Sequence, residues 1–206
     1  MDASVSQQVF RKVLEAMARP GRIVKLPDVP LASPTSNKYP FLILSTLLDH
    51  EVGFNIVDGR IFGGRESDLK KRSDSDSGPI SDYLSSATGS REVSIEDADF
   101  VLIFGGRSGS AIGRVKRGRL EYPDESATLI YDVDEIGNDL FSDGSFLIIS
   151  GPGMPSGRNM AIKGIDESEV EELAKANSQF PLGLDIIFSD NTGQVACLPR
   201  SVRVRC

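Results

Sequence analysis

Four short runs of almost uninterrupted apolar residues constrain the fold of this chain more than any other feature. They span residues 100–104, 127–131, 146–150 and 184–188. Apolar runs of this length are typical of strands that are buried on both faces. Helical segments alternate with these runs, so the sequence predicts an α/β fold in which helices flank a mixed sheet. We expect a single domain over residues 1–206, because this length suits one large domain.

An amphipathic helix is predicted over residues 6–19. Its apolar residues recur at helical spacing and predict one stripe that faces the core. The members of this stripe are Phe10, Val13, Leu14 and Met17. Pro20-Gly21 follows directly and ends the helix, since proline disfavours helical geometry in the residue before it.

Two other segments carry helical signals of different strength. Residues 39–48 are almost continuously apolar, a pattern that fits a buried helix or a buried strand equally well. Residues 166–178 predict an acidic helix that begins at Asp166. Glu169, three residues further on, can complete a capping box, and acidic residues suit the positive end of the helix dipole.

Polar segments mark two connections. Residues 189–193 separate the apolar runs 184–188 and 194–198, which is typical of a hairpin turn between two strands. Residues 63–78 are rich in glycine, serine and aspartate and predict a surface loop. We do not interpret them as a domain linker, because the flanking segments continue one α/β alternation.

The composition excludes several classes of protein. A net charge of −7 argues against a general nucleic-acid binder and against docking on an anionic membrane. No apolar run approaches the ~20 residues of a membrane-spanning helix, and the polar start of the chain does not resemble a signal peptide. Only two cysteines are present, too few for a disulfide framework, so we expect a reduced, cytoplasmic protein.

Residues that could support catalysis or cofactor binding are scarce. The glycines within residues 105–113 follow an apolar run, but the Gly-Lys-Ser/Thr ending of a phosphate-binding loop is absent. His50 is the single histidine and cannot build a usual zinc site with two distant cysteines. Cys197 lies on a predicted strand and reads as an inert apolar residue. Lys163 lacks the neighbours that activate a Schiff-base lysine, so we expect neither metal nor pyridoxal phosphate.

Basic residues form two local clusters. The first crowds one predicted loop and consists of Arg114, Lys116, Arg117 and Arg119. The second lies near the C-terminus, where Arg203 and Arg205 would share one face of a strand and Arg200 precedes them. Guanidinium groups suit a phosphate or phosphonate, but they also suit internal ion pairs or the carboxylates of a partner. Arg200, Arg203 and Arg205 are therefore candidates for either anion or partner contacts.

Six motifs, in order along nearly the whole chain, resemble those of one protein family. They are Phe10-Arg11 with residues 16–21, residues 47–51, residues 118–123 with 127–129, residues 147–154, residues 180–185, and residues 198–201. Together they are similar to the PhnH family of the bacterial carbon–phosphorus lyase machinery, which degrades phosphonates. Residues 60–95 depart from the family pattern.

The resemblance implies structural roles for the motif residues and names no catalytic, cofactor or metal residue among them. These structural residues are Phe10, Arg11, Met17, Pro20, Gly21, Gly151, Pro152, Gly153, Phe180, Pro181, Gly183, Asp185 and Pro199. We expect Gly21 and Gly183 to hold backbone geometry that a side chain would spoil. Phe180 is expected to fill the core beside its turn.

The resemblance also implies a fold and a set of partners. PhnH-like proteins resemble a reduced form of the large domain of pyridoxal-phosphate transferases, without the cofactor apparatus. They form homodimers alone and join PhnG, PhnI and PhnJ in a core complex. With PhnL, the set of PhnG, PhnH and PhnI installs a ribose triphosphate on the phosphonate, and PhnJ then breaks the carbon–phosphorus bond. This implies an accessory subunit, and the alternative is an autonomous α/β enzyme or anion-binding protein that uses the arginine clusters.

Overall fold

A computed structural model describes residues 2–60, 78–139, 141, 144–154 and 156–205, and two sheets organise this part of the chain. The seven-stranded sheet has the order β1-β10-β9-β5-β4-β2-β3. Its strands are β1 (Val24–Lys25), β2 (Gly53–Asp58), β3 (Arg91–Glu92), β4 (Phe100–Phe104), β5 (Thr128–Asp132), β9 (Asp185–Ser189) and β10 (Gln194–Leu198). The four-stranded sheet has the order β11-β7-β8-β6. Its strands are β6 (Glu135–Gly137), β7 (Gly144–Ser150), β8 (Arg158–Lys163) and β11 (Arg203–Arg205).

The large sheet is mixed, as the sequence predicts. Strands β3, β2, β4, β5 and β9 are parallel neighbours, and β10 and β1 add antiparallel pairs at one edge. Side chains on both faces of the parallel strands are buried: Leu129 and Tyr131 of β5 point into one core cluster and Ile130 into the other. A strand that is apolar on both faces needs cover on both sides.

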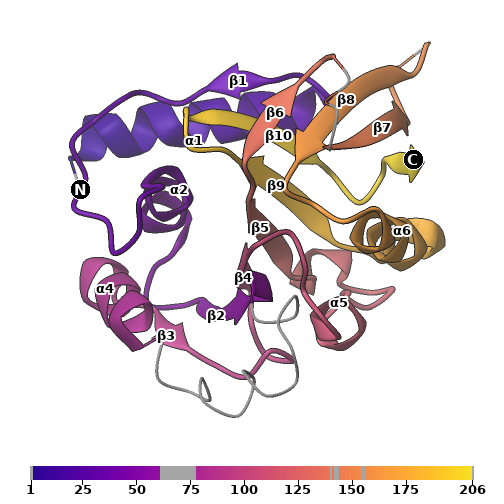
Figure 1. Cartoon of the computed structure of the whole chain (residues 1–206). Coiled ribbons are helices and arrows are strands. Elements are labelled where there is room, and N and C mark those ends of the chain that lie inside the picture. The colour runs from indigo at the N-terminus through magenta and orange to yellow at the C-terminus, as the bar shows by residue number, and fades with distance from the viewer. Residues whose placement is uncertain (1, 61–77, 140, 142–143, 155, 206) are drawn as a thin grey trace, which may run out of the picture.

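Helices supply this cover, and Figure 1 shows them on the two sides of the sheet. The helices are α1 (Ala3–Ala18), α2 (Tyr39–Leu47), α4 (Gly78–Thr88), α5 (Ala111–Arg114) and α6 (Glu167–Ala176), with short 3-10 turns η2 (Pro123–Glu125) and η3 (Asn177–Gln179). Helices α1, α2 and α4 bury apolar residues in one core cluster. Helices α5 and α6 and the small sheet bury theirs in the other. The prediction of a single α/β domain with a mixed sheet flanked by helices is confirmed.

One strand belongs to a different sheet than the sequence suggests. Residues 146–150 were expected in the mixed sheet, but they form most of β7, which pairs with β8 and β11 in the small antiparallel sheet. Leu147 and Ile149 are buried, whereas Ile148 and Ser150 are exposed. Only one face of β7 therefore packs on the core, which is the usual arrangement in an antiparallel sheet.

Helix α1 turns a different face to the core than the predicted stripe. Val9, Val13 and Ala16 are buried, whereas Phe10 is 49% exposed and Leu14 is 55% exposed. Val13 and the partly buried Met17 confirm part of the prediction. The large side chains dominate the pattern in the sequence, but the close contact with α2 and β10 uses the smaller residues beside them.

Helix α6 confirms the predicted acidic helix but not its capping box. Asp166 is the N-cap residue and makes no side-chain cap hydrogen bond, and it forms an ion pair with Arg107 instead. Glu169 turns into the core, where it is 5% exposed. Its Oε1 accepts hydrogen bonds from the Tyr131 hydroxyl at 2.6 Å and from the Ser108 backbone N–H at 3.0 Å. Burial and the nearby Glu169 charge raise the pKa of Tyr131 well above its usual value.

Two remaining predictions have clear outcomes. Residues 39–47 form helix α2, which resolves the choice between helix and strand. Residues 189–193 connect β9 and β10 as an antiparallel hairpin. The polar segment 63–78 and Cys206 lie outside the described residues, apart from Gly78 at the start of α4. Within the described residues, no helix combines the length and hydrophobicity that crossing a membrane requires.

Replacing Glu169 by alanine should lower the free energy of unfolding by about 2–3 kcal/mol, because it leaves two buried donors without their acceptor. Urea denaturation measures the change. Glu171→Ala serves as the control, since Glu171 lies on the same helix and is exposed. Equal effects of the two substitutions would contradict a structural role for the buried carboxylate.

Candidate functional site

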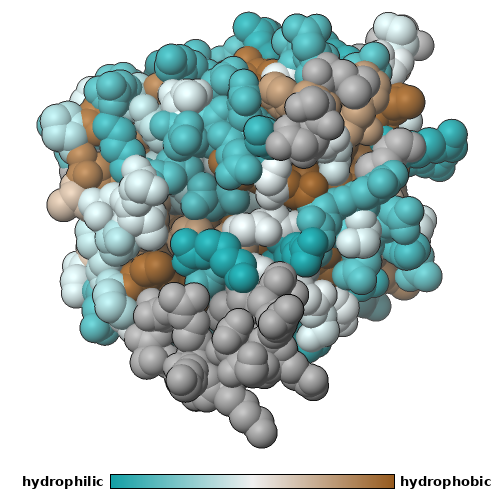
Figure 2. Space-filling model, viewed as in Figure 1, coloured by the Kyte–Doolittle hydropathy of each residue, from teal (hydrophilic) through white to brown (hydrophobic). Residues whose placement is uncertain are grey.

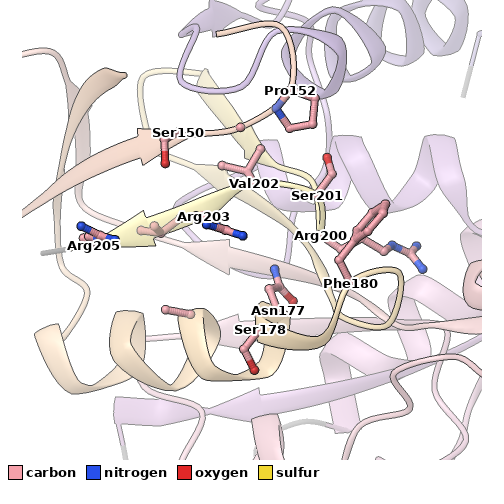
Figure 3. A pocket seen from close by; sticks show the side chains of 13 residues that line it. Ser150, Pro152, Asn177, Ser178, Phe180, Arg200, Ser201, Val202, Arg203 and Arg205 are labelled. Atoms are coloured by element: carbon pink, nitrogen blue, oxygen red, sulfur yellow. The ribbon is translucent and has the colours of Figure 1, made fainter. Parts of the chain in front are cut away.

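Three of the six motifs meet in one groove of about 650 Å³ between the C-terminal end of α6, the end of β7 and strand β11. Figure 3 shows the groove with Arg203 and Arg205 on one side and Asn177 and Ser178 facing them from below. Its lining comprises Ser150, Gly151, Pro152, Ala174, Asn177, Ser178, Phe180, Arg200, Ser201, Val202, Arg203, Val204 and Arg205. The lining contains three arginines and no acidic residue, so the groove is positively charged.

Strand pairing sets the direction of two arginines. Strand β11 runs antiparallel to β7, with Arg203 opposite Ser150 and Arg205 opposite Ile148. Val204, between them, packs against the core, so the two arginines lie on the exposed face, as the alternating sequence predicts. Among the described residues, neither Arg203 nor Arg205 has an ion-pair partner. Their charges are available to a ligand or a partner.

Arg200 is committed to the protein itself. Its Nη2 lies 2.5 Å from Oδ2 of Asp185, its Nε lies 3.4 Å from Oδ1, and its backbone N–H donates to Oδ1 at 2.8 Å. It also donates to the carbonyl of Pro123. The side chain of Arg200 is only 17% exposed. This ion pair links the turn after β10 to the start of β9. Arg200 therefore lines the groove, but its charge is already paired with Asp185.

Two turns complete the groove. After β7 the chain turns through Gly151, Pro152 and Gly153, closed by a hydrogen bond from the Met154 N–H to the Gly151 carbonyl. After β10 a second turn is closed by a hydrogen bond from the Val202 N–H to the Pro199 carbonyl. The two motifs that contain these turns thus shape a single surface.

Phe180 lies at the rim of the groove and is 65% exposed, so the expectation that it fills the core is wrong. Leu184 takes the buried position that follows the turn. The peptide bond between Phe180 and Pro181 is cis. Figure 3 shows Phe180 standing beside Arg200 and Ser201. An exposed aromatic side chain in a groove that also contains unpaired arginines is a combination that protein interfaces favour.

The turn that carries Phe180 is held by Asn177, which the sequence analysis did not single out. Its amide donates to the Leu184 carbonyl at 3.0 Å and accepts from the Leu184 N–H at 2.7 Å. The only signal in the sequence is an asparagine directly after the periodic part of a helix, a common end of helices. Gly183 approaches closely: a Cβ there would lie 2.6 Å from the Asn177 Oδ1.

The N-terminal motif lies outside the groove. Gly21 has a φ of +74° and lies against Ile149 and Arg158 of the small sheet. The Arg158 guanidinium donates to the Pro20 carbonyl at 3.4 Å. Phe10 and Arg11 are exposed on α1. The motif therefore joins α1 to the small sheet.

The other basic cluster is engaged in local contacts. Arg114 pairs with Glu96, Lys116 with Asp99 and Arg119 with Glu125, at 2.8, 2.5 and 2.7 Å respectively. Arg117 donates to the Ile112 carbonyl at 3.2 Å. The sequence left anion binding, partner contacts and internal ion pairs as alternatives for this cluster, and the structure supports internal ion pairs.

The isolated candidate residues do not assemble into a catalytic group. His50 is exposed beyond the end of α2, and Lys163 ends β8. Cys197 is fully buried on β10, where burial strongly raises the pKa of its thiol and suppresses the reactive thiolate. Within the part of the chain that the structure describes, no three His, Cys, Asp or Glu side chains are grouped so that they could hold a metal ion.

Gly183→Ala should lower the free energy of unfolding by about 1 kcal/mol or more, because φ is +152° and the added methyl group would meet Asn177. Thermal or urea unfolding measures the loss. Gly113→Ala is a matched control, since a Cβ at Gly113 has nothing within 4 Å. An unchanged unfolding midpoint for Gly183→Ala would refute this role.

The face of the protein seen in Figure 2 is mostly hydrophilic, with hydrophobic residues in scattered patches.

Comparison with known proteins finds two relatives that are similar to this chain over nearly its whole length. The chain is 29% identical over 198 residues to HtxG of Stutzerimonas stutzeri, named as a C–P lyase subunit, which covers 96% of this chain and 85% of HtxG. It is 27% identical over 205 residues to the alpha-D-ribose 1-methylphosphonate 5-triphosphate synthase subunit PhnH of Rhizobium meliloti (strain 1021), with 97% and 90% coverage.

A family profile described as bacterial phosphonate metabolism protein (PhnH) matches residues 1–61 and 65–205. The match includes all of the residues that line the groove. The chain belongs to the PhnH family of bacterial phosphonate metabolism proteins.

Proposed function

We propose that this protein is an accessory subunit of a carbon–phosphorus lyase complex and that it acts by binding partner subunits. The partners that the family resemblance implies are PhnG, PhnI and PhnJ, with PhnL in the ribosyl triphosphate step. The names of the two relatives support membership of such a complex.

The groove is the contact surface that we propose for a partner subunit. It contains the exposed ring of Phe180 at one end and, farther along, Arg203 and Arg205, whose charges are not neutralised by described residues (Figure 3). Aromatic residues and arginines are enriched among the residues that dominate binding energy at interfaces. The partner surface that complements this groove carries carboxylates and an apolar pocket for Phe180.

In the absence of its partners, we propose that the protein forms a homodimer in the cytoplasm. The surface reserved for other subunits would then be covered by a second copy. The alternative is an autonomous enzyme or anion-binding protein that uses its arginine clusters. The local pairing of Arg114, Lys116 and Arg119 disfavours this alternative.

Co-expression with PhnG, PhnI and PhnJ from the same source tests the proposal. The chain should co-purify with them as a stable complex, and its deletion should abolish growth on methylphosphonate as the phosphorus source. Purified alone, it should show no turnover of phosphonate. If it fails to co-purify and its deletion leaves growth intact, the assignment is wrong.

Reversing the charge of Arg203 and Arg205 together, to glutamate, should weaken assembly at least tenfold, or about 1.4 kcal/mol. The wild-type affinity should fall as salt is added, and the variant should lose most of this dependence, because exposed charges are screened. Arg91→Glu is the control, since Arg91 is exposed on β3 at the far edge of the large sheet. Equal affinities of the double variant and the control variant would place the interface elsewhere.

A further inference from the structure

A second cavity, a cleft of about 530 Å³, lies at the carboxyl ends of β2, β4 and β5. Its charged and aromatic lining residues are Arg60, Phe104, Arg107, Asp132, Asp134 and Asp166. It shares no lining residue with the arginine groove. The groove lies near Asp185, the first residue of β9, and therefore at the opposite edge of the parallel strands.

The topology of the sheet makes this edge a favoured place for a ligand. The parallel strands have the order β3-β2-β4-β5-β9, and the order reverses between β2 and β4. Helix α4, before β3, packs on one face, and α5, before β5, packs on the other. In open α/β sheets of this order, ligands bind in the crevice at the carboxyl ends beside the reversal point.

Backbone contacts hold the walls of the cleft together. A Cβ at Gly59 would lie 1.9 Å from the Arg107 carbonyl oxygen, and a Cβ at Gly106 would lie 1.9 Å from the Gly164 carbonyl oxygen. The loops that follow β2 and β4 and the loop before α6 therefore touch main chain to main chain. A cleft built in this way is preformed, as small-molecule sites usually are.

The charges in the cleft are unbalanced. Arg60 forms a two-point ion pair with Asp58, with both distances 2.7 Å, and Arg107 pairs with Asp166. These pairs leave Asp132 and Asp134, which have no cation within ion-pair distance in the described part of the chain. The cleft consequently holds two carboxylates that form no direct ion pair with a described residue, although the charge of Arg60 acts on Asp132 from a distance.

Asp132 is the better enclosed of these two carboxylates. Its Oδ1 accepts a hydrogen bond from the Asn37 amide at 2.6 Å, whereas its Oδ2 accepts none from the described residues. Burial raises the pKa of Asp132, although the hydrogen bond from Asn37 and the positive charge of Arg60 partly oppose this effect. A carboxylate that is partly withdrawn from water and has no directly paired cation is best satisfied by a cationic donor.

We propose that this cleft binds a small molecule through an ammonium group held by Asp132 and Asp134. The identity of the ligand rests on the proposed function: it is an aminoalkylphosphonate whose phosphonate group lies toward Arg107. A guanidinium has five N–H donors, more than the carboxylate of Asp166 can occupy. The pair of Arg107 and Asp166 is also half exposed, so it is weak enough to be shared with a ligand.

Calorimetric titration of the purified full chain with three probes tests this assignment. The probes are 2-aminoethylphosphonate, ethylphosphonate, which lacks the amine, and ethanolamine, which lacks the phosphonate. We expect 2-aminoethylphosphonate to bind at least tenfold more tightly than ethylphosphonate and more tightly than ethanolamine. Ethylphosphonate binding as tightly as 2-aminoethylphosphonate, or no binding of either amine, would overturn the ammonium site. Equal binding of the two amines would overturn the aminoalkylphosphonate.

Two isosteric variants locate the binding site. Asp132→Asn and Asp134→Asn should each weaken 2-aminoethylphosphonate binding at least tenfold, whereas Asp124→Asn, an exposed control on η2, should not. Asp134 is exposed, so its variant keeps the test valid if the loss of Asp132 disturbs folding. Unchanged affinity in Asp134→Asn would refute the site. Neither variant should alter co-purification with partner subunits, so this result is independent of the assembly proposal.

Discussion

The central constraint on this protein is that its parallel strands are buried on both faces. Leu102 and Ile103 of β4, and Ile130 and Tyr131 of β5, point into separate core clusters on opposite sides of the sheet. Each face must be covered by apolar surface, at a gain of about 25 cal/mol for each Å² removed from water. Helices α1, α2 and α4 supply one cover. The other cover consists of α5, α6 and the small antiparallel sheet (Figure 1). The groove lined by Arg203 and Arg205 lies where α6 meets this small sheet.

The arginine groove is a consequence of that second cover. Strand β11 closes the small sheet next to α6, and the space between them becomes the groove. The ion pair of Arg200 and Asp185 fixes its end, because it links the turn after β10 to the first residue of β9. Asp185 holds Arg200 against the fold, whereas the alternation of side chains along β11 turns Arg203 and Arg205 outward.

The proposed partner surface and the proposed ligand cleft lie at opposite edges of the parallel strands. The groove lies at the amino edge of the parallel strands and the proposed amine site lies at their carboxyl edge. The groove is positively charged, and the cleft holds two carboxylates that form no ion pair with a described residue. A subunit that docks through one edge can thus leave the other edge open to a small molecule.

The sequence by itself determined the fold class, because short apolar runs such as 100–104 and 127–131, alternating with helical segments, are typical of strands covered on both faces. It also determined the family, through motifs such as residues 180–185 and 198–201, and the alternation that places Arg203 and Arg205 on one face. Only the tertiary structure decided which helix faces are buried, because Phe10 and Leu14 share the helical spacing of Val9 and Val13.

Long-range pairing likewise decided the candidate sites. Residue spacing does not reveal that Arg200 is taken by Asp185 or that Glu169 reaches Tyr131, since these partners lie on separate elements. The cleft around Asp132 was equally hidden, because its walls come from the ends of three strands that meet only in the sheet. Local patterns specify the elements, and the packing of distant elements specifies which charged groups remain free to bind.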